Sequence, residues 1–485
     1  MKTVRVETTR RAIVAFAVLA LLPVVPSSAQ TVLGDLANPS NQADYIVITP
    51  ASYVGTLSPL ADYRAQHDGL QVVFALTDSI YSQFPSTTPD SALRSFIMYA
   101  LSAWSDPKPA FVLLGGGLNA VPGHRAQSDM STFGEDSVLL DSWFALAEDA
   151  SVSGLTATLA LGRFPASDAA ELGSMVTKTI GYAAAPQGAW TSRSIALADS
   201  LGFDVFEQSA DQWQAVVGEL WRDTLTGHVR SASPRAWSAE RFGEELNGGA
   251  ALVTYWGHGG SAQLGGSAAF FTPEDVGSIS AGSPLAFWFL TGAHPWDGTA
   301  DSSIVLSLLA KENGGAIAVC ASPGLHFFGS HVDFMMHLAD LMIASPSMPI
   351  GQQLQASISS QITSEQSLAG RLTLLGDPAL VLASPVVAGT APPESSLPSH
   401  PELLQNYPNP FNPSTAIAFA LPHSMRVTIK VYNALGQEIA TLLDGVRQAG
   451  SGVVEWNAQG FASGVYLYRL TAGSTVRTRT MILLR

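Results

Sequence analysis

The sequence predicts an α/β protein with mainly parallel β-sheets and flanking helices, followed by a small antiparallel β-sandwich. From Tyr45 to about Leu382, short apolar runs alternate with stretches of helical periodicity. This alternation is typical of parallel sheets covered on both faces. Residues 403–485 instead hold evenly spaced short strands separated by Gly and Asn turns, as expected of a small sandwich. With 47% hydrophobic and 13% charged residues, the chain can bury a large core.

Residues 1–29 have the pattern of a signal peptide. Basic residues precede an unbroken apolar run from Ala12 to Leu22, and small residues stand before Gln30. The run is shorter than the about 20 apolar residues that a membrane-spanning helix needs, and no later stretch is long and apolar enough for one. We therefore expect an exported mature protein without a transmembrane segment.

The first large domain is predicted over residues 45–385. Helical stretches begin near Asp90, Asp168, Gln212 and Ser302, the third running to Leu225. The region is long enough for two parallel sheets side by side. The strands that we expect are Tyr45–Thr49, Val72–Leu76, Ala110–Leu114, Ser194–Ala198, Ala251–Trp256, Leu285–Leu290 and Ala316–Cys320.

A change of composition separates this domain from the C-terminal one. Residues 386–402 hold four prolines and several serines, which indicates a linker. Residues 403–485 then form the predicted sandwich. The strands that we expect there are Val427–Tyr432, Gly452–Trp456, Gly464–Leu470 and Val476–Leu484.

The charge is unevenly spread along the chain. The formal net charge is −15, yet residues 403–485 hold seven basic and three acidic side chains, and residues 30–402 carry about −22. An acidic body repels phosphate backbones, so the composition argues against nucleic acid as a partner.

Cys320 is the single cysteine of the chain. An exported protein with one cysteine has no internal disulfide, so its core must stabilise it. Cys320 lies inside an apolar run and is interpreted as a buried small residue. The alternative is that it serves as a nucleophile.

The C-terminal region carries four motifs in order: Leu404–Pro413, Tyr432 with Leu435–Gln437, Trp456-Asn457 and Ala462–Tyr466. With these motifs the region resembles the sorting domain of type IX secretion over its whole length. The resemblance implies that residues 403–485 are an address for the type IX secretion machinery and carry no catalysis. It also implies that the protein passes through the periplasm and reaches the cell surface or the medium.

The predicted domain over residues 45–385 carries a second series of motifs, of which Tyr255–Gly259 is the most specific. The others are Leu113–Gly116 with Val121-Pro122, Asp141–Phe144, Leu161–Pro165, Glu171 with the helix of Lys178 and Tyr182, and Leu374–Leu380. With these motifs the domain resembles the gingipain-type cysteine peptidases, which have a caspase-like fold. The resemblance implies a peptide or protein ligand.

His258 is the candidate catalytic histidine. It follows an apolar strand and stands between two glycines, where the chain must turn. Ligands bind at this edge of open parallel sheets, and a histidine there can act as general acid or base. The resemblance implies the same role. The alternative interpretation is a histidine that only forms a hydrogen bond in a loop and has no catalytic role.

The family's nucleophilic cysteine is missing. The resemblance implies that the strand Leu285–Leu290 delivers the nucleophile, and the corresponding position holds Thr291. A thiol is partly ionised near neutral pH, whereas a threonine hydroxyl needs a strong base in close contact. The replacement predicts a loss of amide cleavage.

Other candidate groups form no recognisable site. Ser261 and Ser267 lack a nucleophile-elbow pattern, and His294 lies three residues from Thr291 across a proline. His326, His331 and His337 do not have helical zinc spacing, and Gly115–Gly117 indicates only a turn. We expect no cofactor, although acidic loops are compatible with structural calcium.

Three hypotheses about function follow. The first is a peptidase homologue that keeps His258 but binds peptides or partners without cutting them. The second is an active peptidase that uses Cys320, Thr291 or another nucleophile. The third is a structural surface protein. The first two are distinguished by whether a nucleophile lies within hydrogen-bond reach of His258.

Overall fold

The chain divides into two compact units, Met1–Ser384 and Pro385–Arg485. The computed structural model describes residues 31–385, except 129, 131–134, 136, 150–153, 185–187, 200–203, 230–235, 267–268, 294–302, 325–327 and 363–367, and residues 401–483, except 404–405, 407–410, 412, 422–424, 434–435, 448–449 and 474. The predicted signal peptide 1–29 and residues 386–400 of the predicted linker lie outside this part. The two units are described separately below.

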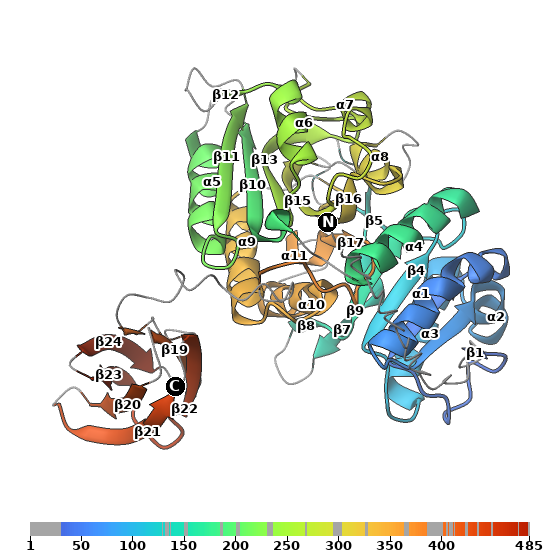
Figure 1. Cartoon of the computed structure of the whole chain (residues 1–485). Coiled ribbons are helices and arrows are strands. Elements are labelled where there is room, and N and C mark those ends of the chain that lie inside the picture. Colours follow the sequence, from blue (N-terminus) through green and yellow to red (C-terminus); the bar gives the residue numbers. More distant parts are fainter. Residues whose placement is uncertain are drawn as a thin grey trace, which may run out of the picture. The chain divides into compact units, whose positions relative to one another are not determined.

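A single large sheet forms the centre of the first unit (Figure 1). The predicted mainly parallel sheet is confirmed, but the expectation of two separate sheets is wrong, because the described strands join into one. Its order is β1 (Thr31–Val32), β3 (Val72–Leu76), β2 (Tyr45–Thr49), β4 (Phe111–Gly115), β9 (Ala160–Phe164), β17 (Thr373–Leu375), β16 (Ala316–Ala321), β15 (Ala286–Ala293), β13 (Leu252–Gly260), β10 (Arg193–Asp199), β11 (Asp223–Val229) and β12 (Ala236–Trp237), with β14 (Gln263–Leu264) beside β13.

The sheet has two halves that run in opposite directions. In the first half, strands β1, β3, β2, β4 and β9 are parallel to one another. In the second half, strands β16, β15, β13, β10, β11 and β12 are parallel to one another. Strand β17 joins them: it is parallel to β9 but antiparallel to β16. The carboxyl ends of the strands in the two halves therefore lie at opposite edges of the sheet. His258 belongs to the second half.

Helices cover both faces of this sheet. One face packs against α1 (Val54–His67), α4 (Ala169–Ala184), α6 (Ala239–Asn247), α7 (Pro273–Gly277) and α8 (Ile304–Ala310). The opposite face packs against α2 (Thr77–Gln83) and α3 (Pro89–Ala103) in the first half, and against α5 (Asp204–Val217), α9 (Phe328–Ala344) and α10 (Ile350–Gln361) in the second. The short helix α11 (Leu368–Arg371) precedes β17. Two hairpins, β5–β6 (Arg125–Gln127, Ser137–Leu139) and β7–β8 (Leu146–Asp149, Gly154–Ala157), lie outside the sheet.

The junction of β9 and β17 is where two sequence motifs meet. Gly162 and Gly376, each a glycine in a Leu-Gly motif, approach so closely that a Cβ on Gly162 would lie 2.3 Å from the Gly376 carbonyl oxygen. The Gly376 amide donates to the Arg163 carbonyl at 2.8 Å. Only glycine permits this backbone approach. The glycines of both Leu-Gly motifs are therefore needed for the packing of β9 against the segment after β17.

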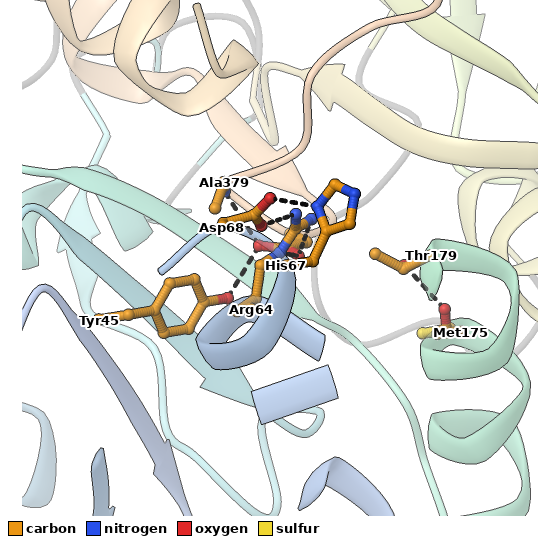
Figure 2. A network of polar contacts seen from close by, with 8 residues as sticks. Tyr45, Arg64, His67, Asp68, Met175, Thr179 and Ala379 are labelled. Carbon is orange, nitrogen blue, oxygen red and sulfur yellow. Dashed lines mark hydrogen bonds and ion pairs between the residues drawn. The ribbon is translucent and has the colours of Figure 1, made fainter. Parts of the chain in front are cut away.

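Buried charges reinforce the same junction (Figure 2). The Arg64 guanidinium of α1 donates two hydrogen bonds to Asp377, at 2.9 and 2.7 Å, and the Tyr45 hydroxyl donates a third at 2.8 Å. Burial alone would lower the pKa of Arg64, but the Asp377 carboxylate raises it. Burial and the same carboxylate raise the pKa of Tyr45. These contacts tie the segment after β17 to the first half of the sheet.

The second unit is a β-sandwich with its own core, as predicted. A three-stranded sheet has the order β18 (Glu402–Leu403), β19 (Ser414–Leu421), β22 (Gly450–Asn457), and a four-stranded sheet has the order β21 (Glu438–Arg447), β20 (Met425–Tyr432), β23 (Gly464–Ala472), β24 (Thr475–Leu483). Neighbouring strands in both sheets are antiparallel. The buried core includes Ile417, Phe419, Ile429 and Tyr468.

One helix prediction was wrong in its bounds. The stretch Gln212–Leu225 was predicted as a helix, but α5 begins at Asp204 and ends at Val217, and Leu225 lies in β11. The side chain of Leu225 packs against the core of the opposite face from α5. An apolar residue at helical spacing was therefore part of the next strand.

Candidate active site

His258 lies at the carboxyl end of β13. The pairing of β13 with β15 shifts register between Trp256 and Gly259, so His258 stands at an irregularity of the strand. Its side chain is half exposed, at 50%. The strand continues to Gly260, so the turn that we expected directly at the histidine comes slightly later.

Gly257 makes room for an acidic neighbour. A Cβ on Gly257 would lie 2.3 Å from the Cβ of Asp199 and 2.8 Å from the Tyr255 hydroxyl. Such distances are too short for any real side chain, so position 257 accepts only glycine. Gly257 permits close packing between β13 and β10, which ends at Asp199.

Asp199 is the site residue that sequence reasoning missed. Its carboxylate is fully buried, and one oxygen lies 3.7 Å from Nδ1 of His258. The ring of Phe206, from the first turn of α5, packs edge-on against the imidazole with centroids 5.0 Å apart. The sequence did hold one signal for Asp199: it directly follows the predicted strand Ser194–Ala198. Because adjacent parallel strands have their carboxyl ends at the same edge of a sheet, a residue in that position can lie near His258.

This arrangement is suited to proton transfer. The Asp199 carboxylate stands 3.7 Å from one ring nitrogen of His258, and an imidazole can give or take a proton through either ring nitrogen. The exposed side of the His258 ring remains accessible to a ligand at the sheet edge.

Thr291 lies on the neighbouring strand β15, and its hydroxyl already donates a hydrogen bond to the main chain. It pairs in register with Trp256, and its side chain is fully buried. The hydroxyl donates a 2.7 Å hydrogen bond to the carbonyl of Tyr255, whose own hydroxyl donates to the carbonyl of His258 at 2.6 Å. The structure thus brings His258 and Thr291 to the same edge of the sheet, both in contact with Tyr255.

Cys320 lies one strand further away. It is in β16, which β15 separates from β13, and it pairs in register with Phe289. The thiol is fully buried among apolar side chains, and this burial raises its pKa well above the ordinary value. A thiol held in the neutral form is a poor nucleophile.

The other candidates form no second centre among the described residues. Ser267, His294 and His326 lie outside them. His331 is buried, and His337 contacts the hydroxyl of Ser360 through Nε2 at 3.0 Å. Where the structure describes the chain, no three His, Cys, Asp or Glu side chains are grouped to hold a metal ion.

Comparison with known proteins identifies the first unit. The model of peptidase family C25 matches residues 38–383, and the chain belongs to this family, the gingipain family of cysteine peptidases. Gingipain R, an Arg-specific cysteine proteinase, has a similar structure with a TM-score of 0.57 at 14% identity, over 94% of this chain and 100% of that one. The pro- and mature domains of RgpB from Porphyromonas gingivalis give 0.56 at 14% identity, over 91% and 100%. At this identity the likeness shows the fold alone. No curated protein matches the chain.

The second unit is a sorting domain. The model of the secretion system C-terminal sorting domain matches residues 405–484. The chain is therefore an exported protein of the type IX secretion route, handled by that machinery and directed to the cell surface or medium. In the described part of the chain, no helix has both the length and the apolar character needed to cross a membrane.

Proposed function

We propose that this chain is a secreted gingipain-family protein that binds peptide or protein segments without hydrolysing them. The observation that carries the proposal is the state of Thr291. Its hydroxyl is buried and donates its proton to the Tyr255 carbonyl. A hydroxyl becomes a nucleophile only when a base in direct contact takes that proton. A main-chain carbonyl cannot act as that base.

Cys320 does not offer a substitute. Strand β15 stands between it and the strand of His258, and burial keeps the thiol protonated. An attack on a peptide at the sheet edge would need the thiolate and an open path to it. The buried position of Cys320 supports a structural role.

Binding has better support than cleavage. His258 is half exposed at the carboxyl edge of parallel strands, beside a buried carboxylate, and this is where ligands of open α/β sheets bind. Peptides are the substrate class of the family. A site that keeps the histidine and lacks the nucleophile can still contact a peptide without forming an acyl-enzyme.

The test is to follow labelled casein with the purified chain. We expect the casein anisotropy to rise with protein concentration, while electrophoresis shows intact casein after prolonged incubation. His258→Ala should weaken binding, because it removes the exposed ring at the edge. Thr291→Val is the matched control: it replaces the buried hydroxyl by a methyl group of the same shape and should leave binding unchanged. Cleavage by the wild type that disappears in Thr291→Val or Cys320→Ser would contradict the proposal.

A further inference from the structure

The signature residues of the sorting unit are largely internal. Trp456 and Tyr466 are 4% and 7% exposed, and their rings pack together with centroids 5.4 Å apart. Phe411 packs on the same indole, and the Tyr466 hydroxyl donates to the Ala462 carbonyl at 2.7 Å. These residues stabilise the sandwich. A partner that recognises the folded unit must therefore contact other side chains.

The outer face of the four-stranded sheet is unusually apolar at one end. Tyr466, Tyr468 and Leu470 of β23 are buried, so the residues between them point outward. The register places Val465 beside Ile482 and Leu467 beside Thr480. Tyr432 of β20 lies next to Leu467. Antiparallel sheets with one solvated face normally present polar side chains there.

We call Tyr432, Val465, Leu467 and Ile482 the outer apolar patch. Val465 is 48% exposed and Ile482 is 38% exposed. Clusters of exposed apolar side chains with tyrosine and arginine are typical of protein–protein contacts. Arg469 supplies the arginine: its guanidinium lies over the Tyr432 ring, 4.9 Å from the centroid.

The charges differ between the two sides of the patch. The outward positions of β23 and β24 are Val465, Leu467, Arg469, Thr471, Val476, Thr478, Thr480 and Ile482, without a carboxylate. On the side of β21, Glu438 pairs in register with Tyr432, and its carboxylate lies 2.9 Å from the Lys430 ammonium. A complementary surface is therefore apolar in its centre and acidic at the part of its rim that faces β23 and β24, where Arg469 lies.

We propose that the outer apolar patch is the surface through which the sorting unit docks on a protein receptor of the secretion machinery. The match to a secretion sorting domain indicates that secretion machinery recognises this unit, and the patch combines exposure, apolar character and a neighbouring arginine. The receptor surface that fits it has an apolar depression with acidic side chains on the side that faces Arg469. This inference does not depend on whether the first unit cleaves peptides.

A charge of either sign at one position tests the docking surface. Thr480 lies on the edge strand β24, next to Leu467 and two residues from Ile482, and is exposed. In the bacterium that makes the chain, we expect full-length Thr480→Glu to be exported at least about tenfold less than wild type and to collect in the periplasm, as for loss of an interface contact. Thr480→Lys should be exported within about twofold of wild type, because its charge suits an acidic rim. Wild-type export of Thr480→Glu would overturn the proposal, and equal loss in both variants would overturn the acidic character of the receptor.

A second variant separates docking from folding. The double substitution Val465→Thr with Ile482→Thr keeps β-branched side chains suited to strands but removes the exposed apolar pair. We expect the same loss of export with unchanged thermal unfolding of the purified full-length chain. Val446→Thr is the matched control, because Val446 is 62% exposed on β21, at the far edge of the same sheet. Equal export of the double variant and the control would contradict the proposal.

Discussion

Two glycines around His258 have different surroundings, which gives a sharp test of the site's packing. A Cβ on Gly257 would meet Asp199 at 2.3 Å, whereas one on Gly260 would meet nothing within 4 Å. Gly257→Ala must therefore push β13 away from β10, at a cost of roughly 2 kcal/mol or more. Gly260→Ala should change stability by less than about 1 kcal/mol. Urea unfolding of the two variants compares them, and equal stability would mean that the two strands can separate locally without loss.

Lys178 is buried, and in the described part of the chain its ammonium is held by main-chain carbonyls. Its ammonium donates to the carbonyls of Leu308, Gly314 and Ala316, at 3.4, 3.3 and 3.0 Å. Burial, aided by the positive charge of Lys311, lowers the pKa of Lys178 to about 7. The carbonyl of Leu308 lies in the last turn of α8, where a cation is favourable.

This lowered pKa predicts a pH dependence of stability. Between pH 7 and the ordinary lysine range, the unfolded chain holds a proton that the folded chain has released. The contribution of Lys178 to the free energy of unfolding should thus rise with pH, by up to about 1.4 kcal/mol per pH unit. Lys178→Met removes this titration, so the stability difference between wild type and variant should move in favour of wild type from pH 7 to 9.5. A constant difference in urea unfolding across that range would refute the lowered pKa.

At the level of single residues, the sequence indicated His258 and Thr291 as candidates but not Asp199. A histidine between glycines after a strand is a local signal. The contact of Asp199 with His258 joins residues 59 positions apart in the sequence, and no local pattern predicts which strand lies next to which. The burial of Thr291 likewise depends on the packing around β15.

At the level of elements, the junction between β9 and β17 depends on side chains more than on backbone pairing. The two strands pair in register at one position, Leu375 with Arg163. The apolar strands themselves were predictable, since fully buried parallel strands are continuous apolar runs. Their union into one sheet was not, because β17 is only three residues long and reverses the direction of pairing.

Loss of the Asp377 carboxylate should therefore lower the stability of the fold more than loss of the Asp68 carboxylate. Both Asp377 and Asp68 bond Arg64, but Asp377 is fully buried and Asp68 is 30% exposed. Asp377→Asn leaves the buried Arg64 cation with the partly exposed Asp68 carboxylate as its counter-charge and should cost about 3 kcal/mol. Asp68→Asn should cost less than about 1 kcal/mol. Chemical denaturation of both variants decides the order, and a larger loss for Asp68→Asn would show that the junction does not depend on this buried pair.

At the level of the whole molecule, stability comes from the cores and not from cross-links. Cys320, the one cysteine of the chain, is buried and unpaired with any second thiol. The melting temperature should not change in dithiothreitol, because no internal disulfide exists to break. A thiol reagent should react with about one group per chain in denaturant and with almost none in the folded protein. A large drop of melting temperature in dithiothreitol would indicate a bridge between two chains.

The reversal of the sheet at β17 also determines how the first unit can be divided. Cutting the chain between β9 and β10 would leave each fragment with one set of parallel strands, and this suggests two small domains. Yet one apolar cluster includes Val47 and Phe111 from the first set and Leu197 and Tyr255 from the second. Each fragment alone would expose its share of that cluster to water. The unit therefore lends itself to a split protein whose fragments regain structure only when they are produced together.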